Sequence, residues 1–337
     1  MNIEERQKFW ETLCSFTGEQ IENEIKILKS SIRYPKYLFR YRSVNNNNLE
    51  ALRTNKIFFS KASKYDDPFD TFLNIDINRF QSEFENVFKD FKKIDKVVNA
   101  VRMLSELGHI EIQEGLIDKI MLPDNGYRND LENQFLSYAL NFRTKIQDNI
   151  QSICFSENGY NETLWLKYAD MHKGFVQIYD LEKAENFHCG KYEKCKNCGI
   201  SRYGLSLYPI CYSDTPYNAT EFVKNIMGKE MLENAGPQVS SYLKEEFSIK
   251  TWEIERCSLI KKTCHMYDEE WRIISNCQMK EPAIMEWIPD AVILGLRTSK
   301  VDENLIISMA KEAGIEKIYK SYIDEKNKLN ALLIKNT

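Results

Sequence analysis

The chain of 337 residues is poor in glycine, with 13, and it contains neither a Gly-x-Gly-x-x-Gly sequence nor a Walker-type phosphate loop. Because Rossmann domains and P-loop NTPases bind phosphates through these glycine-rich turns, the sequence argues against both modes of nucleotide binding. Histidine is scarce as well, with four residues. No Ser-His-Asp or Cys-His combination can be assembled from them, so hydrolysis by such a triad is not expected.

The sequence also lacks a long apolar run and a strong net charge. Nowhere do 18 apolar residues follow one another, and the opening MNIEERQKFWETL is acidic and amphipathic, unlike a signal peptide. The formal net charge is −4, from 46 basic and 50 acidic residues, so no overall field attracts nucleic acid or an anionic membrane. The nine cysteines are an odd number and lie mostly in apolar segments, which is typical of reduced thiols. We therefore expect a cytoplasmic protein with no membrane partner.

What is present is a succession of short strands and amphipathic helices. The 43% apolar and 28% charged fractions are typical of a globular protein. Apolar periodicity predicts a helix over residues 3–29, within an N-terminal segment 1–35, and a helical insertion over residues 79–150. Strands precede this insertion and dominate from residue 151 onward. This order predicts an α+β fold with a largely antiparallel, split sheet in a single domain over residues 36–337.

Six short motifs follow one another along the chain. They are Tyr41-Arg42, Phe59-Ser60, the loop Asp66-Asp67-Pro68-Phe69-Asp70, Phe155-Ser156-Glu157, the turn from Trp165 to Gly174, and Glu270-Trp271-Arg272. In this order they resemble the pattern of the bacterial domain-of-unknown-function family 2971 over residues 36–335, with Asp66 where asparagine is usual. The order of elements is also similar to that of the ADP-ribosyltransferase fold, especially of the enzymes that modify nucleic-acid bases. This resemblance implies NAD as the cofactor, a nucleic acid or protein as the acceptor, and a role as a toxin or phage-defence effector.

The same resemblance implies roles for residues on three strands. In these enzymes a basic residue on the first strand holds the dinucleotide, a Ser or Tyr on a following strand flanks the nicotinamide, and a late Glu contacts the ribose. Arg42, Ser60 and Glu270 occupy the matching places. A carboxylate at that place would stabilise the oxocarbenium character that the ribose develops as nicotinamide leaves.

Strand periodicity extends this set. Alternate side chains share a strand face, so Glu270 and Arg272 should point together, as should Arg40 and Arg42. A forked guanidinium suits a pyrophosphate, and we predict cofactor binding by Arg42, Arg40, Tyr41 and Arg272. The alternatives are a structural Glu–Arg pair on one strand and a solvated basic face on an edge strand.

The turn from Trp165 to Gly174 supplies a further candidate. Trp165, Tyr168 and His172 are spaced to share one face of a short helix. Such a face would stack a planar ring or place a general base, which makes His172 a predicted catalytic residue. The alternative is a helix packed on the sheet, with His172 satisfied by a backbone carbonyl.

Clustered carboxylates leave another function open. Asp66, Asp67 and Asp70, together with Glu157, are the kind of group that a Mg²⁺-dependent nuclease or phosphodiesterase needs. The same loop is also ordinary turn chemistry, in which Asp side chains bond nearby amides and Pro fixes φ. A non-catalytic recognition module on an enzyme-like fold is the third alternative.

A cysteine-rich loop over residues 186–204 indicates a separate site. Cys189, Cys195 and Cys198 supply three thiols, and Cys211 or His188 would be the fourth ligand of a tetrahedral structural zinc. Lysines within the loop would suit a nucleic-acid contact. The alternative is a surface loop with free thiols.

Overall fold

The computed structural model describes residues 1–107, 115, 119, 126–183, 207–234, 236–243, 245, 247–275 and 284–336. Contacts divide the chain into two compact units. Unit 1 comprises residues 1–71, 149–215 and 258–337, and unit 2 comprises residues 72–148 and 216–257. Most of the predicted insertion therefore belongs to a unit that also takes in residues 216–257. Within the described ranges, no helix has the length and apolar character needed to cross a membrane.

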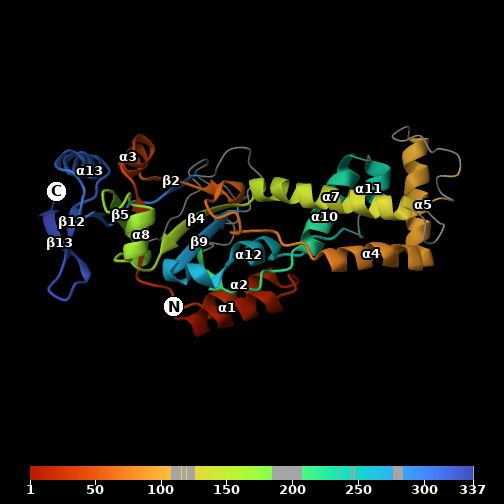
Figure 1. Cartoon of the computed structure of the whole chain (residues 1–337), viewed down its shortest axis with the longest axis horizontal. Coiled ribbons are helices and arrows are strands. Elements are labelled where there is room, and N and C mark those ends of the chain that lie inside the picture. Colours follow the sequence, from red (N-terminus) through yellow and green to blue (C-terminus); the bar gives the residue numbers. More distant parts are fainter. Residues whose placement is uncertain are drawn as a thin grey trace. The chain divides into compact units, whose positions relative to one another are not determined.

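Unit 1 contains the sheets, whose elements are labelled in Figure 1 where there is room. The strands are β1 (Tyr37–Arg42), β2 (Lys56–Phe58), β3 (Ser60–Lys61), β4 (Gln151–Ser156), β5 (Phe175–Asp180), β6 (Leu207–Pro209), β7 (Cys211–Tyr212), β8 (Ile260–Lys261), β9 (Glu270–Ser275), β10 (Ile284–Glu286), β11 (Ala291–Leu294), β12 (Lys317–Ile323) and β13 (Leu329–Asn336). The helices of unit 1 are α1 (Ile3–Ser15), α2 (Ile21–Ser30), α3 (Asn46–Arg53), α8 (Glu162–Lys167) and α13 (Lys300–Glu312), with 3₁₀ turns η1 (Ala62–Lys64), η2 (Leu181–Lys183) and η4 (Thr263–Asp268).

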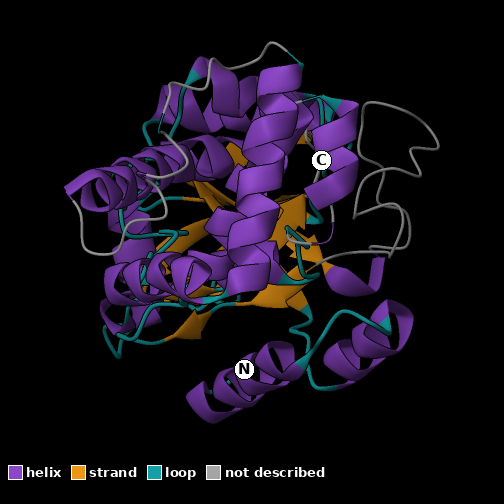
Figure 2. Cartoon of the chain, turned by 90° about the vertical axis from the view of Figure 1, so that its right-hand side faces the viewer, coloured by secondary structure: helices purple, strands orange, loops and turns teal. Residues whose placement is uncertain are grey.

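Unit 2 is described as helices: α4 (Ile77–Lys89), α5 (Phe91–Glu106), α7 (Gly126–Asn149), α10 (Thr220–Asn234), α11 (Pro237–Leu243) and α12 (Glu253–Ser258). They are drawn in purple in Figure 2, together with the helices of unit 1. Phe84 of α4 and Phe135 of α7 bring their ring centroids to 5.9 Å. The apolar periodicity of residues 79–150 thus corresponds to helices that pack on one another.

The main sheet of unit 1 has nine strands in the order β13-β12-β11-β5-β1-β4-β9-β6, with β3 also paired to β4. Every pair in it is antiparallel except β11 with β12. The predicted α+β class with a mostly antiparallel sheet is therefore confirmed.

The centre of this sheet is nearly split. β1 pairs with β5 along its whole length, from Tyr37 to Arg42, but with β4 through the single residue pair Phe39–Ser156. On that side of β4 the next partner is β3, whose Ser60 lies opposite Ser152. Among the described strands, none pairs with Ile153–Phe155 on that side, so a gap opens between β1 and β4 within the sheet.

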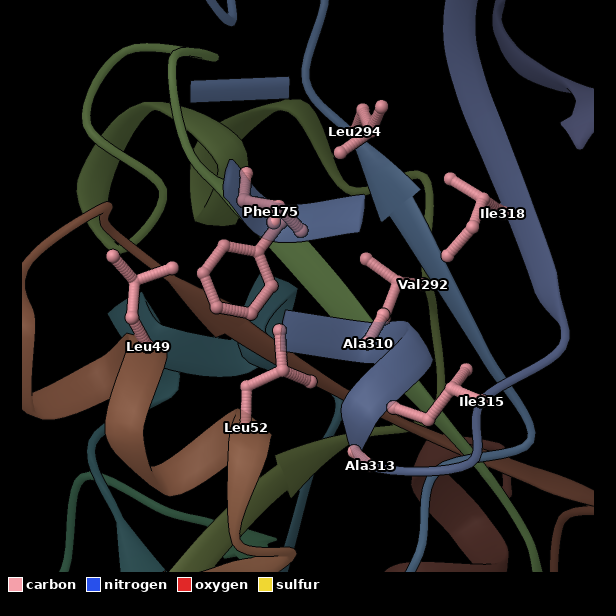
Figure 3. Packing of buried hydrophobic residues seen from close by; sticks show 10 residues of the cluster. Leu49, Leu52, Phe175, Val292, Leu294, Ala310, Ala313, Ile315 and Ile318 are labelled. Atoms are coloured by element: carbon pink, nitrogen blue, oxygen red, sulfur yellow. The ribbon is translucent and has the colours of Figure 1, made fainter. Parts of the chain in front are cut away.

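Two buried clusters cover the two faces of the sheet around β5. Figure 3 shows Leu49 and Leu52 of α3 packed with Phe175 of β5 and with Ala310 of α13. Val176, the next residue of β5, lies in the second cluster with Trp165 of α8. Neighbouring residues of a strand point to opposite faces, so β5 is packed from both sides.

The N-terminal segment differs from the single helix predicted over residues 3–29. Two helices, α1 and α2, are separated by residues 16–20, where Gly18 has a positive φ of 83°. The Glu24 carboxylate accepts the amides of Thr17 and Gly18 at 3.2 and 3.0 Å and so holds this turn. Both helices belong to unit 1.

Candidate functional site

A cavity of about 290 Å³ lies at the gap between β1 and β4. Its lining comes from β1, β3, β4, α8, β8, β9, η4 and the loop of residues 65–70. Six of the residues predicted for catalysis or cofactor binding line it together: Arg40, Tyr41, Arg42, Ser60, Glu270 and Arg272. Arg40 and Arg272, which are 232 positions apart in the sequence, are thus brought to one place by the sheet order.

The β1 side of the cavity is cationic. For Arg40 and Arg42 the described part of the chain provides no ion-pair partner, although the Tyr179 hydroxyl lies beside Arg40. Burial, together with the smaller effect of the Arg40 charge, lowers the pKa of Arg42 to about 9. Two half-buried like charges side by side are unfavourable without an anion, so this wall is suited to an anionic ligand.

The β9 side carries a carboxylate held between two cations. Glu270, 5% exposed, accepts from the Arg272 Nε at 2.6 Å and from the Lys261 Nζ at 2.8 Å. Burial alone would raise the pKa of Glu270, but the charges and hydrogen bonds of Arg272 and Lys261 outweigh it and hold that pKa well below its usual range. The carboxylate is therefore ionised at neutral pH, as stabilisation of a ribosyl cation requires.

Arg272 is 1% exposed and is bonded on several sides by the protein itself. Its Nη1 and Nη2 donate to the two carboxylate oxygens of Asp70 at 2.8 and 2.5 Å, and Nη1 also donates to the Ser258 carbonyl at 2.8 Å. Glu270 and Arg272 do point together, as strand periodicity predicts. Because these protein groups already bind the guanidinium, the geometry favours a role for Arg272 in positioning Glu270. It does not favour the predicted contact of Arg272 with a cofactor.

Lys261 is a site residue that the motifs did not reveal. Its ammonium lies 2.9 Å from Asp268, 2.8 Å from Glu270 and 3.5 Å from Asp70. Burial would lower its pKa, yet the surrounding carboxylates raise it, so the lysine stays charged. It lies on the two-residue strand β8, too short for a periodic pattern to single it out.

Protein groups also neutralise the carboxylates of the alternative metal site. Asp70 binds Arg272, while Asp67 accepts the Phe69 amide at 2.9 Å and lies 3.0 Å from the His265 Nε2. Glu157 accepts the Trp271 indole at 2.7 Å and pairs with Arg6 at 3.3 Å. Within the described ranges no three His, Cys, Asp or Glu side chains are arranged to hold a metal ion. The bond from the Phe69 amide to the Asp67 side chain is the turn chemistry expected of this loop, and metal binding by the loop stays a prediction.

His172 lies away from the cavity. α8 ends at Lys167, and Asp170, Met171 and His172 all have positive φ, so the chain leaves the helix before His172. The imidazole stacks on Trp165 with 5.7 Å between centroids, and burial lowers its pKa. The predicted shared helical face is therefore wrong for His172, while Tyr168 does line the cavity.

Four cysteines were predicted to bind zinc, and three of them, Cys189, Cys195 and Cys198, lie outside the described residues. Cys211 is buried on β7, and its thiol lies 3.6 Å from the Gln7 side-chain oxygen. Zinc binding therefore stays a prediction.

A thiol that the sequence patterns did not indicate also lines the cavity. Cys154 lies in the middle of β4, and its side chain faces the cavity. Burial raises the pKa of this thiol to about 12, and the nearby Glu270 carboxylate adds to the shift.

Comparison of the chain with protein-family models, with curated proteins and with solved structures found no match.

Proposed function

We propose that unit 1 is an ADP-ribosyltransferase-like enzyme that binds NAD in the gap between β1 and β4. The observation that carries this proposal is the placement of Arg40 and Arg42, which have no ion-pair partner among the described residues, on the same cavity as the ionised Glu270. An anionic cofactor would supply a counter-charge to the arginines of the β1 wall. The Glu270 carboxylate, on the other side of the cavity, would stabilise positive charge on the ribose of that cofactor.

In this proposal each wall of the cavity has one task. Arg40 and Arg42 bind the pyrophosphate, for which a forked guanidinium is well suited. Ser60 flanks the nicotinamide ring. Glu270 stabilises the ribosyl cation as the glycosidic bond breaks, and one such contact is commonly worth about 3–4 kcal/mol of barrier.

The size of the cavity limits how much of the cofactor it encloses. Ligand pockets typically measure about 300–1,000 Å³, and this one measures about 290 Å³. We therefore expect it to take up the nicotinamide ribose and pyrophosphate, with the adenosine outside. The acceptor, a nucleic acid or a protein, would reach the sugar from the cavity mouth. Membership of domain-of-unknown-function family 2971, a toxin or phage-defence role and a cytoplasmic location remain parts of this proposal.

The test is nicotinamide release from NAD by the purified chain, with and without single-stranded DNA, RNA or cell lysate as acceptor source. Release should be lost in Glu270→Gln, which keeps the size of the side chain, and binding should weaken in Arg42→Ala. Arg53→Ala, which removes an arginine exposed at 41%, is the matched control and should retain activity. If no labelled product forms from NAD with any acceptor, the enzyme proposal fails. NAD binding without turnover would instead support the recognition module.

A further inference from the structure

The main chain of Glu270 is held from behind by the N-terminal helix. Arg6 of α1 is 3% exposed, and its Nη1 donates to the carbonyls of Glu270 and Ile210, both at 2.9 Å. The Glu270 amide in turn donates to the Tyr212 hydroxyl at 2.8 Å. The Arg6 guanidinium lies 5.6 Å from the Tyr212 ring centroid and 5.7 Å from that of Trp271. Both backbone groups of Glu270 are therefore fixed by groups outside the cavity.

The residue before Glu270 has a conformation that needs such support. Glu269 has φ 45° and ψ 45°, in the left-handed region of backbone conformation that residues other than glycine rarely adopt. Its carbonyl accepts the Glu157 amide at 3.1 Å. A strained residue of this kind persists where the surroundings hold it, and such residues concentrate at functional sites.

Glu157 links the two features. Its carboxylate accepts the Trp271 indole at 2.7 Å and pairs with Arg6 at 3.3 Å, while the Met1 amino group lies 2.6 Å from it. Arg6 and Glu157 together therefore enclose residues 269–271 from the face opposite the cavity. Neither of them lines the cavity, so neither reaches the ligand.

We infer that Arg6 is a positioning residue for Glu270, so that helix α1 sets the geometry of the reactive carboxylate without touching substrate. This inference rests on the proposed function for the catalytic role of Glu270. Arg40 and Arg42 lie on β1, whereas the hydrogen bonds and ion pair of Arg6 in the described structure go to Met1, Ile210, Glu270 and Glu157. We therefore expect the pyrophosphate side to be independent of α1. Loss of Arg6 should therefore separate turnover from anion binding.

The test uses the full chain with Arg6→Ala, Arg6→Lys and, as a control, Arg33→Ala, whose arginine is 70% exposed and forms an exposed pair with Glu5. Three quantities are measured: kcat and KM for nicotinamide release, the Kd for inorganic pyrophosphate, and amide hydrogen exchange over residues 268–273. In Arg6→Ala we expect kcat to fall at least tenfold, KM and the pyrophosphate Kd to stay within twofold, and exchange over these residues to accelerate. Arg6→Lys should recover part of kcat, and Arg33→Ala should match the parent.

Two results would overturn the inference. One is an unchanged kcat in a folded Arg6→Ala chain, and the other is a parallel loss of kcat and pyrophosphate binding, which would show a general structural role. If Arg6→Ala does not fold, Arg6→Lys carries the same comparison with a smaller expected loss of kcat. If the parent itself releases no nicotinamide, the proposed function fails separately. Hydrogen exchange then decides, and unchanged exchange over residues 268–273 would refute positioning by Arg6.

Discussion

Replacing Arg272 by methionine should reduce the free energy of unfolding of unit 1 by about 3–5 kcal/mol, the cost of leaving a buried charge without its partner. The side chains of Asp70, Asp268 and Glu270 are 6%, 5% and 7% exposed and share two cations, Lys261 and Arg272. After the substitution one lysine faces three carboxylates. Domains are stable by about 5–15 kcal/mol, so this loss is a large fraction of the total.

Urea unfolding followed by tryptophan fluorescence measures this loss. Of the five tryptophans, Trp10, Trp165, Trp271 and Trp287 belong to unit 1. The control is Arg53→Met, which removes an exposed arginine paired with Glu50 at 2.6 Å and should cost less than about 1 kcal/mol. Equal, small effects of the two substitutions would refute the idea that the network around Glu270 depends on Arg272.

The same variant should alter the dependence of stability on pH. In the parent chain the folded pKa of Glu270 lies below its unfolded value, so its contribution is present above the unfolded pKa, about 4.3, and is lost as the pH falls. Without Arg272, less opposes the effect of burial on Glu270, so the pKa of Glu270 in the folded state rises. Stability should therefore fall less steeply with acid below about pH 5 in the variant.

Four further outcomes are expected. Arg42→Ala should weaken pyrophosphate binding at least tenfold by calorimetry, since it removes a half-buried cation of the cavity wall that would pair with the ligand. Gly174→Ala should destabilise unit 1 by about 1–3 kcal/mol in urea, because a Cβ there would lie 2.1 Å from the Arg42 carbonyl. At pH 8 iodoacetamide should modify exposed Cys264 well before Cys154 by mass spectrometry, since a pKa of about 12 leaves on the order of 10⁻⁴ of the latter as thiolate. Zinc analysis of the purified chain should find one bound ion that Cys195→Ser removes, and a zinc-free parent would end that hypothesis.

What the sequence could predict here follows from short-range periodicity. A period of two places Glu270 with Arg272, and Arg40 with Arg42, and both pairs line the cavity as expected. The α+β class likewise follows from the order of short strands and amphipathic helices. These inferences need only residues close together in the chain.

What the sequence could not predict depends on long-range register and on backbone conformation. Arg6 bonds a carbonyl 264 residues away, and no local pattern marks such a partner. Positive φ is uncommon in residues other than glycine, and three such residues in succession, from Asp170 to His172, take the chain out of the helix. The helical spacing therefore gave a wrong position for His172. The position of the gap depends on where β1 stops pairing with β4, which is a property of tertiary packing.

That gap has a mechanical consequence for unit 1. The strands from β13 to β1 and those from β4 to β6 are joined within the sheet by one rung, at Phe39 and Ser156. A ligand spanning Arg42 and Glu270 would act as the missing rungs between the two halves. The gap is thus the place where the sheet should part first in local opening, and a bound ligand should make the whole sheet more rigid.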